Sequence, residues 1–301
     1  MAFVIDAVGG VVLAAVAATL LAIQNVCVRL ATDGGRVSDA VVVVMAVNVG
    51  LVVPLALVVH YPVSGLTWRS AGAFATAGIL GLVFGRICLY AGIELIGASR
   101  TTPIVSASTL ISAILAVWLF GESLTVPHVI GICCIVAGVA VLSWLTAADA
   151  PESALRDVWY SLTFPIAAAV FLGVEPILIR TGLDEGTPVL VGLAVMMGAA
   201  FVSYLGYRLG TGRPAPSLRQ NPHARWYLGA GLTSTVGLCS YFAALALAPV
   251  VIVIPLVQTA PLAVIVISAL FLPRRLERVT WPLVVAAIVV VVGAILVSLA
   301  G

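Results

Sequence analysis

The sequence predicts an all-α integral membrane protein with ten transmembrane helices, and three observations support this fold class. Of the 301 residues, 62% are hydrophobic and 9% are charged, whereas a soluble domain carries about 25% charged residues. The apolar runs each extend over roughly 20 residues, which is the length of a spanning helix and twice that of a strand in a membrane barrel. With a short loop added to each span, the chain length accommodates about ten spans and no further domain.

Ten apolar runs, taken in order along the chain, define the expected helices. The first run follows Asp6 and has neither a basic start nor a clean cleavage site, so it predicts a retained helix rather than a signal peptide. Polar stretches at 147–157 and 210–225 separate the fifth run from the sixth and the seventh from the eighth. The expected helices lie at about 8–30, 41–60, 70–96, 102–120, 126–146, 158–181, 188–209, 226–246, 250–271 and 279–299.

The first polar stretch divides the chain into two blocks that resemble each other. We expect five-helix repeats at 1–147 and 157–301, joined by a short polar linker at 148–156. Shifts of 151, 152 and then 155 residues match Arg29 with Arg180, Met45 with Met196, Cys88 with Cys239, Tyr90 with Tyr241, Pro103 with Pro255, Pro127 with Pro282 and Ser143 with Ser298. Two apolar sequences also match in part by chance, but ordered matches at a slowly drifting offset favour a repeat.

The odd number of helices in each block has a mechanical consequence. The second block must enter the bilayer from the opposite side, so the two repeats are inverted about an axis in the membrane plane. Inverted repeats are typical of secondary transporters, in which a central site opens alternately to either face.

Three segments of the first block carry a resemblance to a known family. The stretch from Tyr90 to Pro103, the segment Leu-Phe-Gly-Glu-Ser-Leu at 119–124, and the glycines at 131 and 138 resemble the EamA-like repeat of the drug/metabolite transporter superfamily. The outline recurs from Tyr241 to Leu276, except that Pro273-Arg274 replaces the Gly-Glu pair. The resemblance implies a ten-helix permease for small metabolites and does not imply a particular substrate.

Composition and motifs argue against other functions. A net charge of +2 is too small to indicate nucleic-acid binding, and the absence of any lysine removes a P-loop. Neither H-E-x-x-H nor G-x-S-x-G occurs, and the five cysteines have no metal-binding spacing. We therefore expect no enzyme activity, no metal and no cofactor. The expected function is that of a secondary transporter, a multi-pass protein of the cytoplasmic membrane that moves a small polar or amphipathic metabolite.

Ionisable residues inside the expected helices are the first candidates for a binding site, because a charge at mid-bilayer costs about 2.5–3.5 kcal/mol. Arg86, Glu94 and Glu175 lie well inside helices. Arg86, Tyr90 and Glu94 share one helix face by their spacing of four residues. Two interpretations stay open: Arg86 binds an anionic group of the substrate beside Tyr90, or it forms an ion pair with Glu175 or Glu94 that holds helices together. The helix-end residues Arg29 and Arg180 are expected to reach the interface.

Glu175 is the candidate for proton coupling, since a carboxyl group inside the membrane can carry a proton as well as a charge. Pro176 follows it and is expected to loosen the helix there. The remaining candidates for substrate binding are Gln24, Asn25, Ser106, Tyr241 and Gln258. The face formed by Thr102, Ser106, Thr109 and Ala113 is either a pocket wall or a packing surface. We interpret the Gly81-x-x-x-Gly85 pair as packing.

Orientation and assembly stay open at this stage. Arginines concentrate in the odd-numbered loops, which places both termini outside by the positive-inside rule, whereas the resemblance implies both termini inside. A homodimer is one alternative for the oligomeric state. The alternative function is that of a membrane-embedded enzyme or receptor acting on a lipid or lipid-linked substrate.

Overall fold

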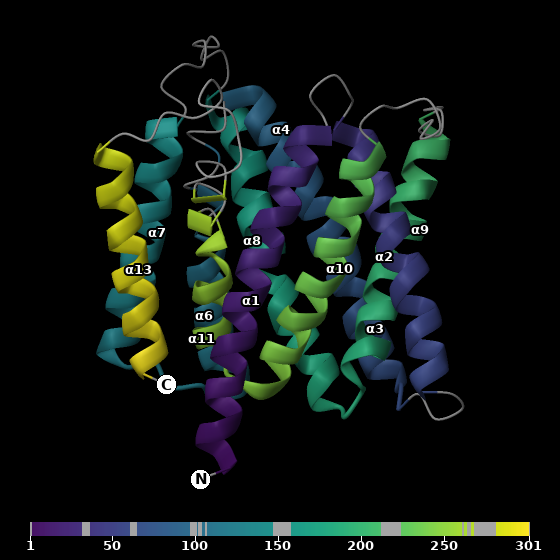
Figure 1. Ribbon diagram of the computed structural model, residues 1–301, viewed down its shortest axis with the longest axis horizontal. Coiled ribbons are helices and arrows are strands. Elements are labelled where there is room, and N and C mark those ends of the chain that lie inside the picture. Colours follow the sequence, from purple (N-terminus) through teal and green to yellow (C-terminus); the bar gives the residue numbers. More distant parts are fainter. Residues whose placement is uncertain are drawn as a thin grey trace.

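The computed structural model describes residues 2–31, 37–60, 65–96, 101, 104–105, 107–146, 158–211, 224–260, 262–263, 266–267 and 281–300, and every regular element within these ranges is a helix (Figure 1). The first block contributes α1 (Ala2–Ala31), α2 (Val37–His60), α3 (Trp68–Ala77), η1 (Gly78–Gly85), α4 (Arg86–Ile96), α6 (Ser108–Phe120) and α7 (Val126–Thr146). The second block contributes α8 (Val158–Asp184), α9 (Val189–Gly210), α10 (Ala224–Leu247), α11 (Val250–Val257) and α13 (Trp281–Ala300).

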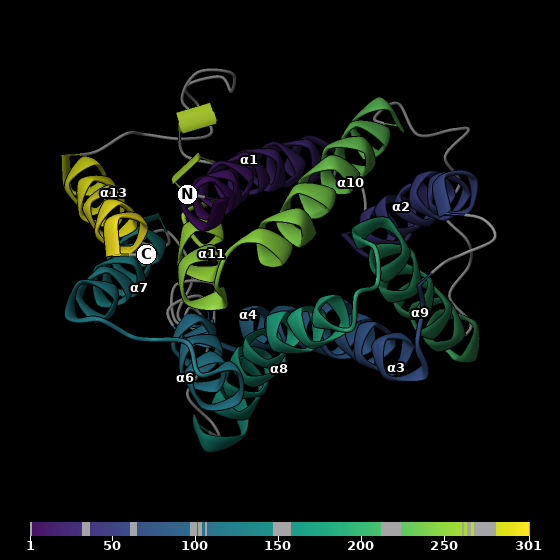
Figure 2. The ribbon, with the colours of Figure 1, turned by 90° about the horizontal axis from the view of Figure 1, so that it is seen from below.

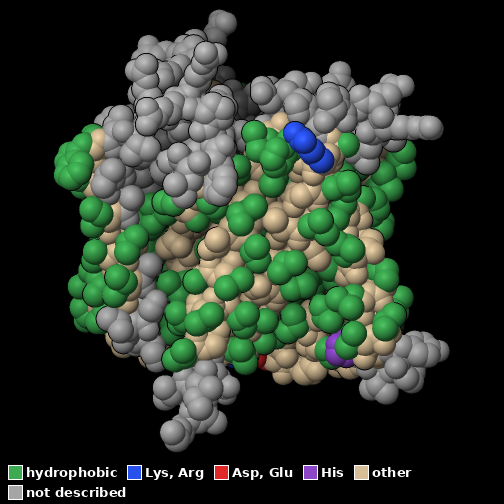
Figure 3. Space-filling view, viewed as in Figure 1, with side chains coloured by type: hydrophobic (Ala, Val, Ile, Leu, Met, Phe, Trp, Pro, Cys, Tyr) green, Lys and Arg blue, Asp and Glu red, His purple; other side chains and the backbone are tan. Residues whose placement is uncertain are grey.

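Six of these helices are long and apolar enough to cross a membrane within the described ranges. The spans are Val8–Val28, Val41–His60, Trp68–Leu89, Leu162–Asp184, Val189–Gly210 and Ala224–Leu247. The outer surface fits such a setting, because one face is covered largely by hydrophobic side chains (Figure 3). Trp68, Trp118 and Trp281 are 94%, 79% and 76% exposed near helix ends, where tryptophans are enriched at membrane interfaces.

Local sequence explains how several helices begin and end. Thr67 caps α3 through a reciprocal pair, because its hydroxyl accepts from the Ser70 N–H at 3.1 Å and the Ser70 hydroxyl accepts from the Thr67 N–H at 3.0 Å. Gly121 ends α6 in the left-handed conformation, with φ of 65°, which a glycine adopts without a steric penalty. Glu122 follows Gly121 in the turn that leads to α7.

The helices form two facing rows closed at each end by a helix pair. Seen along the helix axes, α1, α10 and α11 lie opposite α3, α4, α6 and α8, while α7 pairs with α13 and α2 pairs with α9 (Figure 2). Glycines permit the α7–α13 contact, because a Cβ on Gly131 would lie 2.7 Å from the Gly293 carbonyl oxygen and a Cβ on Gly293 would lie 2.7 Å from the Gly131 carbonyl oxygen. The core between the rows is aromatic and aliphatic, with Phe74 stacked on Phe242 at a centroid distance of 6.0 Å.

Two details of the helices differ from the sequence-based expectation. Pro176 was expected to loosen its helix, but α8 continues through both Pro165 and Pro176 to Asp184. The third helix is not a uniform α-helix, because its middle part, η1, is a π-helix lying between α3 and α4. Nothing in the hydropathy pattern of that run indicated the change, since the segment Gly-Ile-Leu-Gly-Leu-Val-Phe-Gly is apolar throughout.

Candidate functional site

A cavity lies between the two helix rows, and the charged side chains of Arg86 and Glu175 line it. It has about 800 Å³ of space unoccupied by protein atoms. Its polar lining consists of Arg86 from α4, Ser108 from α6, Glu175 from α8, Tyr241 from α10 and Gln258 at the end of α11. Apolar residues of α1, η1 and α11 complete the wall, among them Leu21, Leu82 and Ile254. Side chains from seven helical segments, contributed by both blocks, therefore converge on one space.

A second cavity continues from the first and is more polar. Leu82, Arg86 and Leu238 line both cavities, so Arg86 stands at the junction between them. The second cavity also contains Gln24 and Asn25 from α1, Asn48 from α2 and Ser234 from α10. Arg86 thus shares the second cavity with three amides and one hydroxyl, and the first cavity with Glu175 and Tyr241.

The opposite charges of Arg86 and Glu175 act on each other across the first cavity. The guanidinium and the Tyr241 hydroxyl both lie within electrostatic range of the Glu175 carboxylate. The two charged groups do not form an ion pair with each other, since the ion pairs among the described residues are Arg69–Glu185 and Arg180–Asp184. In this structure Arg86 and Glu175 thus interact across the cavity without the direct ion pair that was one of the two interpretations. The side chain of Glu94, the other partner considered, is outside the described part of the chain.

The Glu175 side chain is seated against the backbone of the third helix. Glu175 is 9% exposed, and its carboxylate lies directly over Gly81 in η1, where an added Cβ would overlap it. Gly85 lies one turn further on, and a Cβ added to it would lie 3.1 Å from the Leu172 side chain of α8. The glycine pair thus brings the third helix close to α8, and π-helical segments occur preferentially at functional sites.

We expect Gly81→Ala to displace the Glu175 carboxylate and weaken transport. Forcing a methyl group into a filled site costs about 1–3 kcal/mol, and the smallest relief is rotation of the Glu175 side chain. Uptake kinetics in proteoliposomes should show the loss, and the double variant Gly81→Ala with Glu175→Asp should recover part of it, because aspartate is one methylene shorter. Gly72→Ala is the matched control, since nothing lies within 4 Å of a Cβ added to Gly72. Equal loss in the single and double variants would show that Gly81 does not act through Glu175.

Asn48 is a polar residue of the cavity that was not predicted from the sequence. Its carboxamide lies 3.2 Å from the Ser234 hydroxyl and 2.8 Å from the Thr235 hydroxyl, and these hydrogen bonds join α2 to α10. Asn48 is 5% exposed. A single asparagine within the run Val-Val-Val-Val-Met-Ala-Val-Asn-Val was the available signal, because polar side chains inside a membrane helix usually have a partner.

Ser108 of α6 is another polar residue of the cavity that was not predicted from the sequence. Ser108 lines the cavity and accepts a hydrogen bond from the Gln258 Nε2 at 3.3 Å, which links α6 to α11. Ser106 lies outside the described residues. Thr109 and Ala113, which share the expected polar face, are 1% and 3% exposed and line neither cavity. For these two residues the packing interpretation of that face holds.

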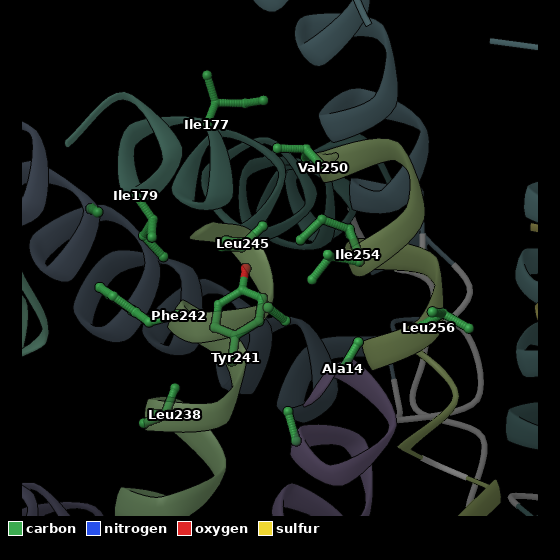
Figure 4. Packing of buried hydrophobic residues seen from close by; sticks show 14 of the residues in the cluster. Ala14, Ile177, Ile179, Leu238, Tyr241, Phe242, Leu245, Val250, Ile254 and Leu256 are labelled. Atoms are coloured by element: carbon green, nitrogen blue, oxygen red, sulfur yellow. The ribbon is translucent and has the colours of Figure 1, made fainter. Parts of the chain in front are cut away.

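Most of the other residues predicted for the site line the two cavities, and the side chains of the rest lie outside the part of the chain that the structure describes. Gln24, Asn25, Arg86, Tyr241, Gln258 and Glu175 all line the joined cavities. Tyr241 stands between Leu238 and Leu245 on α10, close to Ile254 of α11 (Figure 4). The side chains of Tyr90 and Arg29 are not described. Arg180 donates hydrogen bonds to the carbonyls of Leu245 and Ala248, so it caps the end of α10.

Comparisons with known proteins point to one family. A family model for the EamA-like transporter family matches residues 8–144 and 159–299. Among solved structures, a chain titled "Crystal structure of protein" superposes with a TM-score of 0.75 at 17% sequence identity, over 97% of this chain and 96% of that one. The likeness shows a shared fold. No curated protein matches the sequence.

Proposed function

The chain belongs to the EamA-like transporter family, and from this premise we propose that it is a secondary transporter which moves a small polar or amphipathic metabolite by alternating access. As a member of that family it is a multi-pass membrane protein. The observation that carries the proposal is the cavity between the helix rows, in which Arg86 and Glu175 face a common space without pairing with each other. Buried charges of this kind are costly, and in membrane proteins they mark substrate and ion pathways.

The proposed architecture is ten transmembrane helices in two inverted five-helix repeats, at 1–147 and 157–301. The packing pattern supports this symmetry. Under the repeat, α1 corresponds to α8, α4 to α10, and α6 to α11. The α1–α10 contact therefore has the α8–α4 contact as its counterpart, and the α6–α8 contact has the α11–α1 contact; all four contacts occur. The α2–α9 and α7–α13 pairs map onto themselves. Such a twofold relation supports a site between the repeats, where inverted-repeat transporters bind their substrates.

The lining residues suggest how a substrate is held. Arg86 carries a fixed positive charge and donates hydrogen bonds in a planar fork, which suits a carboxylate or phosphate. Glu175 is placed to accept an amine or a proton. Tyr241, Gln258, Gln24 and Asn25 provide hydrogen bonds and shape, and Tyr90 and Ser106 stay candidates for the same roles. We further propose that Glu175 couples transport to the movement of a proton.

An uptake screen in proteoliposomes tests the function. Purified protein should accumulate at least one labelled compound from a panel of amino acids, nucleobases, sugars and organic anions, with and without an imposed pH gradient. Protein-free vesicles give the background. The alternative, a membrane-embedded enzyme or receptor for a lipid-linked substrate, predicts chemical conversion or binding without flux in the same vesicles.

We propose the cytoplasmic membrane as the location and leave the direction of insertion to experiment. Alkaline phosphatase and fluorescent-protein fusions at Gly301 report opposite sides of the membrane. The arginine distribution predicts an active phosphatase and a dark fluorophore. The reverse pattern would show that the chain inserts against its loop charges.

A further inference from the structure

A single carboxylate from the first block caps a helix of the second block. The two oxygens of Glu122 accept hydrogen bonds from the backbone N–H groups of Val250, at 2.9 Å, and Val251, at 3.0 Å. These N–H groups open α11, whose preceding residue, Pro249, provides no side-chain cap. The contact therefore crosses 128 residues of sequence and joins the α6–α7 turn to α11.

The position suits a carboxylate electrostatically. The first N–H groups of a helix have no partner within the helix, and a negative charge there is favoured by the helix dipole. At the same turn, Arg180 donates to the carbonyls of Leu245 and Ala248 at the end of α10. An anion at the start of α11 and a cation at the end of α10 thus fix the break between the two helices. The difference between them is that Arg180 and α10 both belong to the second block, whereas Glu122 belongs to the first.

This contact lies at the end of the molecule away from the polar cavity. In Figure 1, α6 ends and α11 begins at the lower end, and α1 ends and α2 begins at the upper end. The polar cavity is lined from late in α1, at Gln24 and Val28, and from early in α2, at Val41 and Met45, so it extends toward the upper end. Below the first cavity, which contains Arg86 and Glu175, the start of α11 is buried: the exposed fraction is at most 2% for Val250, Val251 and Val253. Glu122 therefore joins the two blocks at the lower end, where the first residues of α11 are buried.

Glu122 and its counterpart in the second block differ in charge. Under the shift that matches Pro103 with Pro255, position 274 corresponds to Glu122, and it is an arginine. A guanidinium has no acceptor for the N–H groups of a helix N-terminus. The residue matched to Glu122 by this shift therefore cannot form the same cap.

We propose that Glu122 is a latch that closes the lower end of the transport pathway and biases the protein toward the state in which the cavity extends upward. The proposal rests on alternating access. Opening the lower end requires α11 and the α6–α7 turn to separate, because they come from different blocks and line or flank the same cavity. Separation breaks both hydrogen bonds of Glu122, whereas the Arg180 contacts within the second block survive it.

Amide hydrogen exchange, measured by mass spectrometry on the purified full-length protein without substrate, tests the latch. Glu122→Gln loses the charge and one of its two acceptors, so the lower-open population should rise about 2- to 30-fold, as for the loss of a helix cap. Exchange should increase at 248–257 and decrease at 24–31 and 41–48, because the upper end closes when the lower end opens. Arg180→Met should increase exchange near Leu245 without changing the upper segments. Ser123→Ala changes an exposed, uncharged side chain next to Glu122 on the same turn and should leave the exchange pattern of the upper segments unchanged.

The reciprocal change is the diagnostic result. An increase confined to 248–257 in Glu122→Gln would show a local cap and overturn the latch. An exchange pattern identical to that of the unmodified protein would overturn it as well. The readout needs no substrate, so a failed uptake screen leaves this test valid, and a confined exchange change leaves the transport proposal valid.

Discussion

Replacing Arg86 by glutamine should lower the apparent affinity for an anionic or zwitterionic substrate by about 10- to 150-fold, which corresponds to the loss of a hydrogen bond to a charged group. The guanidinium stands where the two cavities meet, so a substrate in either cavity contacts it. Saturation kinetics of uptake in proteoliposomes measure the effect as a rise in KM or a loss of flux.

Impaired folding would not explain that result. Removing a charge from the middle of a membrane helix favours insertion by about 2.5–3.5 kcal/mol on insertion scales, so the variant should be at least as stable as the unmodified protein. A thermal unfolding curve checks this point. Arg69→Gln is the matched control, because Arg69 is 86% exposed and its ion pair with Glu185 lies outside the cavity. Unchanged kinetics in Arg86→Gln would show that the arginine has a structural role.

Glu175→Gln should abolish uptake driven by a pH gradient and retain exchange of labelled for unlabelled substrate. Glutamine has nearly the same shape as glutamate and neither takes up nor releases a proton, so a coupled step at this residue stops while binding and reorientation continue. Uptake with an imposed gradient should fall to the level measured without one, and exchange measured in the same vesicles serves as the internal control. A pH dependence identical to that of the unmodified protein would exclude Glu175 as the proton carrier.

Much of the fold could be predicted because a bilayer leaves few options. A chain that is 62% hydrophobic and 9% charged must span as helices, and the described helices begin and end near the predicted ranges, as α9 at Val189–Gly210 illustrates. The π-helical course of η1 was not predicted, because an apolar run has the same hydropathy in either kind of helix; in the structure its Gly81 and Gly85 lie against α8. The continuity of α8 through Pro176 was not predicted either.

The site could be predicted where its chemistry is conspicuous in an apolar run. Arg86 and Glu175 stood out as charges inside helices, and the repeat pointed to Tyr241 and Gln258, all of which line the cavity. Asn48 and Ser108 required three-dimensional information, since each is one polar residue whose partner lies more than a hundred positions away. The role of Glu122 was hidden for the same reason, although its motif was the most distinctive in the sequence.

The most direct test of the central claim, that the cavity around Arg86 and Glu175 is the substrate site, is counterflow of an identified substrate through the double variant Arg86→Gln with Glu175→Gln. Vesicles with the unmodified protein should accumulate labelled substrate against unlabelled substrate inside. At a substrate concentration near the KM of the unmodified protein, vesicles with the double variant, at equal protein content and with an unchanged unfolding temperature, should fall close to the protein-free background, because Arg86→Gln weakens binding. Undiminished counterflow through the double variant would contradict the account and place the substrate site elsewhere in the molecule.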